Sequence, residues 1–274
     1  MTGTSDMSDE ASAHPHVPHR SHHFVDYERV AARYQQGRSL PADVLGSWAN
    51  VVEPYVPPGP IRVVDVGAGT GIFTAAWPRW ATASVVAVEP SAAMVSAGNS
   101  AGNVDDPGAS FVRGVAERLP LRDDSAHVVW VSTALHHFAD VHQAVQDFAR
   151  VLGPGGRVLV RTYAPGRTEI TWLDEFPGRA KWEARCHTEQ QLGDIFRPHS
   201  FDLTDICEVL EWTETYANSA DWVERMRDAD SVLTALSDEE IAEGLRNLRS
   251  TPTKLGRLEL TLFVFTLRRT VPPT

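Results

Sequence analysis

The stretch Val63-Val64-Asp65-Val66-Gly67-Ala68-Gly69-Thr70-Gly71 decides the fold. Its apolar first half predicts a buried strand over Ile61 to Val66, and the pattern after the glycines predicts a helix over Ile72 to Trp80. Glycines in such a turn allow unusual backbone torsions and let a ligand approach without meeting a Cβ atom. The start of the following helix presents free N–H groups and a positive dipole end, which suit an anionic group. The stretch therefore predicts a ligand site at the carboxyl end of the strand.

The spacing of the glycines separates two kinds of cofactor. A dinucleotide fingerprint needs a glycine at the sixth position counted from Gly67, but Ile72 stands there, so the motif is G-x-G-x-G. Glu89 follows the next apolar run, 18 residues beyond Gly71, where a carboxylate can accept hydrogen bonds from both hydroxyls of a ribose. The preceding motif favours this role over that of a solvated glutamate at a strand end.

Short apolar runs alternate with amphipathic helices, which predicts βαβ units and a parallel sheet. Further strands are expected at 84–88, 110–113, 127–131, 157–162, 203–211 and 258–267, and helices at 91–98, 141–152 and 188–198. We therefore expect an α/β fold with a Rossmann-like, doubly wound and mostly parallel sheet of seven strands.

Other regions depart from this alternation. Residues 1–23 hold five of the 11 histidines among Ser, Pro and Ala, which predicts a disordered tail. Residues 24–58 predict two helices that form an N-terminal cap, and 59–274 carry the sheet domain. Irregular and helical stretches around 164–200 and 215–252, with the second helical region beginning after residue 218, are expected to form a lid over a substrate.

Composition and charge limit the classes of partner. The net charge of −11 argues against nucleic acid and membrane surfaces, because both demand a basic face. The N-terminus shows no apolar signal segment and no run is long enough to span a bilayer, so a cytoplasmic location is expected. The two cysteines form no CxxC clip, and we expect no metal site. The oligomeric state stays open, with a homodimer as one option.

Four further segments stand in register with the glycine loop. They are Glu89-Pro90-Ser91 with Met94, Gly114-Val115-Ala116-Glu117-Arg118-Leu119-Pro120, Ser132 to Phe138, and Leu152-Gly153-Pro154-Gly155-Gly156. With these motifs in order, the span from Tyr27 to Thr162 resembles the class I S-adenosylmethionine-dependent methyltransferases, especially their ubiquinone-biosynthesis-like group of small-molecule enzymes. The resemblance implies methyl transfer to a small-molecule acceptor, a secondary metabolite among the candidates. It also implies an antiparallel last strand, which 258–267 fits.

The resemblance implies S-adenosylmethionine as the cofactor and gives its amino-acid end a set of contacts. Asp65 and the backbone of Gly67–Gly71 would hold that end of the cofactor. Ser132 would lie near the sulfonium. Tyr34 and Arg38 belong to a stretch that resembles an N-terminal element whose arginine reaches the cofactor carboxylate.

The resemblance places the other half of the cofactor against the second and third predicted strands. Glu89 would bind the ribose, with Pro90 and Met94 in the same corner. Ala116 would bind the adenine edge through its backbone N–H. The family often has an acidic residue where Val115 stands, so the hydrogen bond to the adenine amino group is either lost or supplied by Glu117.

Methyl transfer is an in-line displacement, in which the enzyme mainly aligns the nucleophile and excludes water. A hydroxyl acceptor also needs a general base. His136 and His137 follow the fourth strand and are the candidates. The competing interpretation is a pair of capping or packing histidines, because the motif is common in the family even where no base is required, and both interpretations stay open.

Aromatic residues in the variable regions predict the acceptor side. Tyr27, Tyr163, Trp172 and Trp182 are expected to bind an apolar or aromatic acceptor, although core packing is the better explanation for at least one of Trp172, Phe176 and Trp182. The sequence does not choose between an O, N or C acceptor.

Two rival functions remain. The first is a methyltransferase-like domain that binds the cofactor without transferring methyl, as a cyclase or a regulator. The second is an NAD(P)-dependent oxidoreductase, which Ile72 and the lack of a Tyr-x-x-x-Lys pair disfavour.

Overall fold

The computed structural model describes residues 26–38, 40–103 and 107–268, so the tail expected over 1–23 lies outside the described residues. The strands are β1 (Ile61–Val66), β2 (Ala83–Glu89), β3 (Ala109–Arg113), β4 (Ala126–Ser132), β5 (Leu152–Thr162), β6 (Phe201–Thr215) and β7 (Leu255–Leu267). The helices are α1 (Tyr27–Gly37), α2 (Ala42–Val52), α3 (Ile72–Trp80), α4 (Ala92–Ser100), α5 (Val141–Val151), α6 (Arg179–Glu183), α7 (Glu189–Phe196), α8 (Tyr216–Met226) and α9 (Asp238–Ser250). Among the described helices, none combines the length and apolar character that a bilayer crossing needs.

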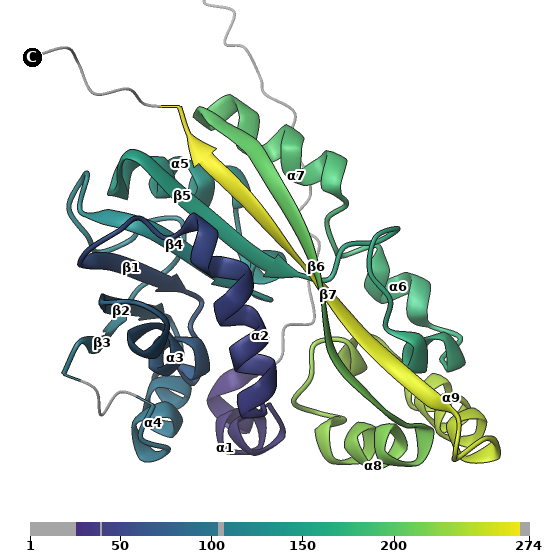
Figure 1. Ribbon diagram of the computed structural model, residues 1–274. Helices are drawn as coiled ribbons and strands as arrows, with labels where there is room; N and C mark the ends of the chain where they lie inside the picture. Colours follow the sequence, from purple (N-terminus) through teal and green to yellow (C-terminus); the bar gives the residue numbers. More distant parts are fainter. Residues whose placement is uncertain (1–25, 39, 104–106, 269–274) are drawn as a thin grey trace, which may run out of the picture.

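These strands form one seven-stranded sheet in the order β3-β2-β1-β4-β5-β7-β6 (Figure 1). The pairs from β3 through β5 are parallel, and β7 is antiparallel to both β5 and β6. Helices α2 and α3 cover one face, where Trp48 and Trp77 are fully buried, and α5 and α7 cover the other through Phe148 and Phe196. The expected Rossmann-like, doubly wound sheet with an antiparallel last strand is confirmed.

The last two strands are longer than the pattern predicts. The alternation of apolar and polar residues predicts strands over 203–211 and 258–267, but β6 and β7 pair with each other out to Thr215 and Leu255. The ladder supplies backbone partners to polar residues such as Glu214, which the sequence pattern cannot reveal. Helix α8 then starts at Tyr216, because the Thr215 side chain accepts a hydrogen bond from Asn218 N. The predicted start after residue 218 was therefore too late.

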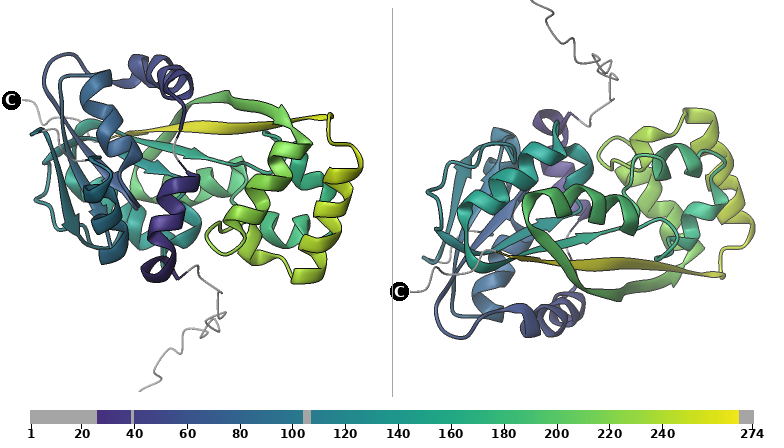
Figure 2. Two further views of the ribbon diagram at one scale, coloured as in Figure 1. Left: turned by 90° about the horizontal axis from the view of Figure 1, so that it is seen from below. Right: turned by 90° about the horizontal axis from the view of Figure 1, so that it is seen from above.

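A helical extension lies beyond the far ends of β6 and β7, at the lower right of Figure 1 and at the right of both views in Figure 2. It consists of the turn Thr171–Glu175, α6, α8 and α9. Helix α9 contacts α8 and the turn, both of which contact β7, and the Lys181–Glu240 ion pair joins α6 to α9. These elements come from the two stretches expected to form a lid. Helix α7 comes from the first stretch too, but it packs on the sheet core beside α5.

The close contact between α4 and the glycine loop yields a stability prediction. A Cβ atom on Gly98 would lie 2.3 Å from Thr70 O, whereas one on Gly46, in α2, would meet nothing within 4 Å. We expect Gly98→Ala to lower the free energy of unfolding by roughly 1–3 kcal/mol through overpacking. Gly46→Ala, the matched control, should raise it by about 0.5–1 kcal/mol, since Gly is a poor helix former. Equal effects of both variants in urea unfolding would contradict this packing.

Candidate active site

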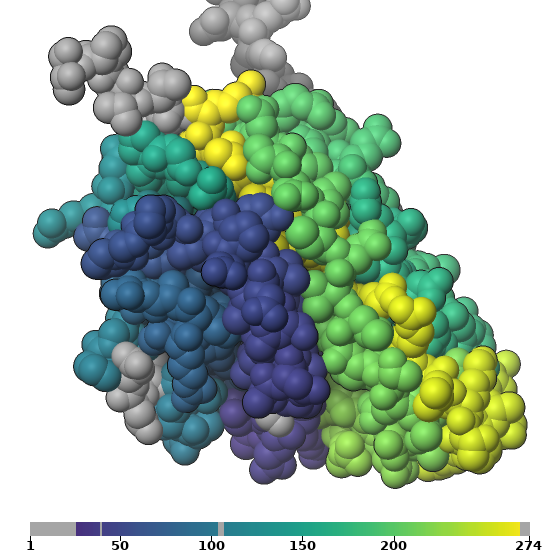
Figure 3. Space-filling view, in the orientation of Figure 1, coloured from purple at the N-terminus to yellow at the C-terminus, as the bar shows by residue number. Residues whose placement is uncertain are grey.

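A cavity of about 440 Å³ opens at the carboxyl edge of the parallel strands. The glycine loop, the ends of β4 and β5, part of β6 and the helical extension line it, together with Tyr34, Arg38 and Leu40 from the N-terminal region. In Figure 3 the purple and dark blue N-terminal helices lie directly against the green segments that follow β6. The cavity therefore lies where an open α/β sheet binds its ligands.

The glycine loop provides a backbone cradle on one side of the cavity. Gly67, Gly69 and Gly71 have φ values of 66°, 57° and 81°, the left-handed region that favours glycine. Asp65 lies buried beneath them, where its carboxylate accepts a hydrogen bond of 2.7 Å from Thr74 Oγ1. Burial, together with the nearby charge of Glu89, raises the pKa of Asp65 to about 7. The loop and this carboxylate can hold a polar group that carries hydrogen-bond donors.

Glu89 is buried at the end of β2 and holds the same loop in place. Its carboxylate accepts hydrogen bonds of 2.9 Å from Gly69 N and from Ser91 N, and burial raises its pKa. Ser91 caps α4 by accepting a hydrogen bond from Met94 N. This corner adjoins the loop but does not line the cavity.

The predicted adenine segment also lies outside the cavity. Val115 is exposed and Ala116 is buried. Glu117 accepts hydrogen bonds from Ala139 N and Asp140 N, at 2.7 and 3.1 Å, and so holds the start of α5. The cavity thus brings together the residues predicted for the methionine end of the cofactor except Gly71, which faces Phe111, and it does not reach those predicted for the ribose and adenine.

The N-terminal helix is tied to the segment after α8. Arg38 forms an ion pair with the buried Asp230, and its guanidinium carbon lies 5.7 Å from the centre of the Tyr34 ring. Trp222 Nε1 donates a hydrogen bond of 3.2 Å to Gly37 O. Asp230 was missed by sequence reasoning, because it belongs to no motif and lies 192 residues from its partner.

The two candidate histidines have different positions. His136 lines the cavity, and its Nε2 lies 3.3 Å from Ser231 Oγ. His137 lies behind it, with Nε2 at 3.1 Å from Tyr27 OH, and neither His137 nor Tyr27 lines the cavity. Burial and the charge of Arg185 lower the pKa of His137 to about 4, and burial lowers that of His136 well below its ordinary value. Both imidazoles are therefore neutral at pH 7.

Aromatic side chains dominate the other end of the cavity. Those that line it are Tyr163, Trp172, Trp182, Trp212 and Trp222. Phe176 is buried against Gly244 instead, which confirms that one of the three predicted lid aromatics is a core residue. Tyr163 OH donates a hydrogen bond to Glu183, and burial together with that carboxylate raises the pKa of Tyr163 to about 12. This end suits an apolar ring.

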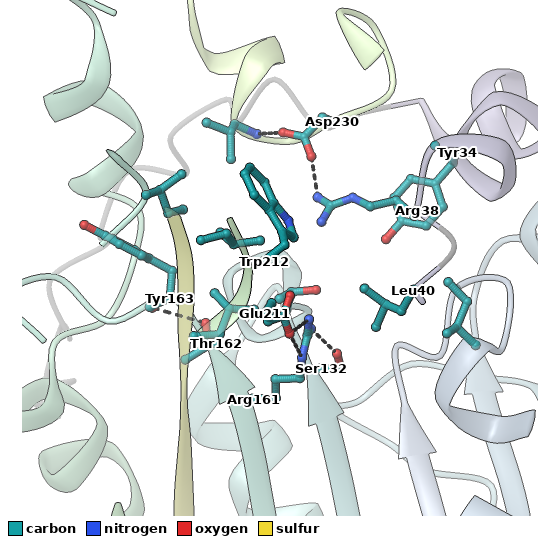
Figure 4. Close-up of a pocket in the computed structure, with 18 of the residues that line it drawn as sticks. Tyr34, Arg38, Leu40, Ser132, Arg161, Thr162, Tyr163, Glu211, Trp212 and Asp230 are labelled. Carbon is teal, nitrogen blue, oxygen red and sulfur yellow. Dashed lines mark hydrogen bonds and ion pairs between the residues drawn. The ribbon is translucent and has the colours of Figure 1, made fainter. Parts of the chain in front are cut away.

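A buried ion pair that the sequence analysis missed lies at the sheet side of the cavity (Figure 4). Arg161 on β5 pairs with Glu211 on β6 and donates a hydrogen bond of 2.8 Å to Ser132 Oγ. Trp48 Nε1 donates to the same glutamate at 2.7 Å. Glu211 lies in a strand whose sequence alternates between polar and apolar residues. A glutamate in such a pattern is normally solvent-exposed, so the local sequence gives no sign that this one is buried.

Comparison with known proteins identifies a family and relatives that resemble this chain. Residues 64–160 match the family described as "Methyltransferase domain". Over 117 residues the chain is 39% identical to the uncharacterized methyltransferase YcgJ of Bacillus subtilis, and the aligned residues make up 42% of this chain and 45% of that protein. It is 31% identical over 152 residues to the ubiquinone/menaquinone biosynthesis C-methyltransferase UbiE of Rubrivivax gelatinosus, and the aligned residues make up 55% of this chain and 58% of that protein. The chain therefore spans about half the length of these curated relatives.

The fold also occurs in a protein named for a different reaction. The crystal structure of the [4+2]-cyclase SpnF has a TM-score of 0.62 and 16% sequence identity, over 89% of this chain and 94% of that one. At this identity the likeness concerns the fold alone.

The loop geometry predicts how two substitutions change cofactor affinity. Glu89→Ala removes a charged hydrogen-bond acceptor and should weaken binding of S-adenosylhomocysteine by about 1–3 kcal/mol, measured by calorimetry. Gly69→Val adds a side chain beside the cavity at a φ of 57° and should weaken binding more. Gly155→Val is the matched control, because Gly155 has a φ of 71° with nothing within 4 Å and does not line the cavity. Parental affinity in both Glu89→Ala and Gly69→Val would place the cofactor elsewhere.

Proposed function

We propose that the chain carries a class I S-adenosylmethionine-dependent methyltransferase domain, that it binds this cofactor at the carboxyl edge of its sheet and that it transfers the methyl group to a small-molecule acceptor. One observation carries the proposal. A single cavity is lined by Asp65 and the glycine loop, by Ser132 and by a group of aromatic side chains.

The residues present fit the methionine end of such a cofactor. Space beside Gly69 is open, since a Cβ atom there would meet only Tyr34, at 3.9 Å. Nε of Arg38 is buried and has no hydrogen-bond partner among the described residues, so a carboxylate can take it. In this proposal Asp65 binds the ammonium group, Arg38 the carboxylate and Glu89 the ribose.

When bound, S-adenosylmethionine supplies a methyl carbon already activated by the sulfonium. The protein's part is to hold the acceptor in line with that carbon and to exclude water. The extension formed by α6, α8 and α9 acts as the lid in this proposal, since Trp182 of α6 and Trp222 of α8 line the cavity.

His136 is the candidate base for a hydroxyl acceptor. It lines the cavity next to the end of β4, and its lowered pKa leaves the imidazole neutral and able to accept a proton. His137, hydrogen-bonded to Tyr27, supports the ring of its neighbour in this proposal, since the two ring centres lie 4.0 Å apart. An amine that is already neutral, or an electron-rich ring carbon, would not need this base.

Transfer of tritiated methyl from S-adenosylmethionine to a panel of planar phenols and anilines tests the proposal. With a phenol acceptor, His136→Ala should lower kcat about a hundredfold or more, with unchanged cofactor affinity. His142→Ala, at an exposed histidine outside the cavity, should leave kcat unchanged. Because the pKa of His136 lies well below 6.5, kcat of the parent should stay constant from about pH 8 down through that value and fall only at lower pH.

Two results would contradict the proposal in different ways. Tight cofactor binding with no methyl transfer to any acceptor would favour the rival function, a domain that binds the cofactor for another purpose. Normal turnover of His136→Ala, with a flat pH profile, would make the histidine pair structural.

A further inference from the structure

Glu211 offers one unused carboxylate oxygen to the cavity. The side chain is 1% exposed, and Oε1 accepts hydrogen bonds from Trp48 Nε1 at 2.7 Å and from Arg161 Nε at 2.8 Å, as well as from Arg161 Nη2. No described residue hydrogen-bonds to Oε2, and this atom is not one of the fully buried atoms that lack a partner, so it is open to the cavity that Glu211 lines. In Figure 4 the dashed lines from Arg161 end on one oxygen of Glu211, and the other oxygen points away from Arg161.

Arg161 links Glu211 to Ser132 and so fixes the position of the Glu211 carboxylate relative to the end of β4. Its Nη1 donates to Ser132 Oγ at 2.8 Å, while Nε and Nη2 donate to Glu211. One guanidinium therefore spans from the end of β4 to β6, across β5 and β7. Since the proposed function puts the sulfonium near Ser132, the same arginine would place Glu211 on the acceptor side of the site.

The surroundings of Glu211 define what can bind it. Apolar and aromatic side chains line the cavity around it, namely Ile170, Trp172, Trp212, Leu258 and Leu260. Because Oε2 opens to the cavity, it can be hydrated there, and an acceptor that displaces this water must supply a hydrogen-bond donor of its own. Arg161 already balances the negative charge of this carboxylate. The group that hydrogen-bonds to Oε2 can therefore be a neutral donor and need not be a second cation.

We propose that Glu211 Oε2 binds the methyl acceptor by accepting a hydrogen bond from its hydroxyl or N–H group, and that the acceptor is an apolar, ring-bearing molecule with that donor beside the methylated position. This inference rests on the proposed function for the place of the methyl group. The aromatic walls bind the ring by stacking and edge contacts, and Glu211 sets its orientation. No proton needs to leave the acceptor for this role.

Binding of naphthalene probes to the full chain saturated with S-adenosylhomocysteine tests the inference by calorimetry. We expect 2-naphthol or 2-naphthylamine, which carry a donor, to bind about tenfold or more tightly than naphthalene and 2-methoxynaphthalene, which carry none. The stronger of the two donor probes identifies the hydroxyl or the amine as the better match. Absence of a donor preference in the parent, or no binding of any probe, would overturn the inference.

Glu211→Gln assigns the preference to this residue. The amide keeps an oxygen for Arg161 and presents N–H groups to the cavity, so the donor preference should disappear. Glu208→Gln on the same strand is the matched control, because Glu208 is 47% exposed, pairs with Arg167 and does not line the cavity. It should retain the preference. An unchanged preference in Glu211→Gln would also overturn the inference.

A second variant covers the case in which Glu211→Gln does not fold. Glu211→Asp keeps the negative charge but withdraws both oxygens by one methylene, so it should lose most of the donor preference while it still binds S-adenosylhomocysteine, and its melting temperature should fall because Arg161 and Trp48 lose contact with the carboxylate. A parental preference in this variant would contradict the inference. Failure to bind S-adenosylhomocysteine, with the donor preference intact in the free protein, would instead contradict the proposed function alone.

Discussion

The position of β1 between β2 and β4 is the constraint on which the site depends. After β1 the chain builds β2 and β3 on one side of that strand, and it then returns to build β4 on the other side. Parallel strands need crossover connections, so the connections that follow β1 and β4 run in opposite directions and leave a gap at the carboxyl ends of these two strands. The glycine loop fills one wall of this gap, and Glu89 ties it to β2 by binding Gly69 N.

The two ends of the cavity are built in different ways. The proposed cofactor end consists of local turns, in which neighbouring residues such as Asp65 and Thr74 hold one another. The proposed acceptor end is assembled from distant parts of the chain, because β6 and the helices after β5 meet there. The Arg161–Glu211 ion pair joins the ends, since the same guanidinium contacts Ser132.

Sequence reasoning predicted the fold well where the signals are local. The strand, glycine turn and helix from Ile61 to Trp80 have the predicted bounds, and α7, which a capping box at Thr188 begins, lies within the helix expected over 188–198. It missed Asp230 and Glu211, because their partners are 192 and 50 residues away and only the folded chain brings them together. Tyr27 also lies behind His137 rather than in the cavity, since periodicity gives the face of a helix but not its neighbour.

Calorimetric titration of the full chain with S-adenosylmethionine, S-adenosylhomocysteine and NADH tests the central claim most directly. The G-x-G-x-G loop beside Asp65 and Glu89 predicts micromolar binding of both sulfur compounds and no heat with NADH. Binding of NADH without any response to S-adenosylmethionine would contradict the account, because the cavity would then belong to a different class of cofactor.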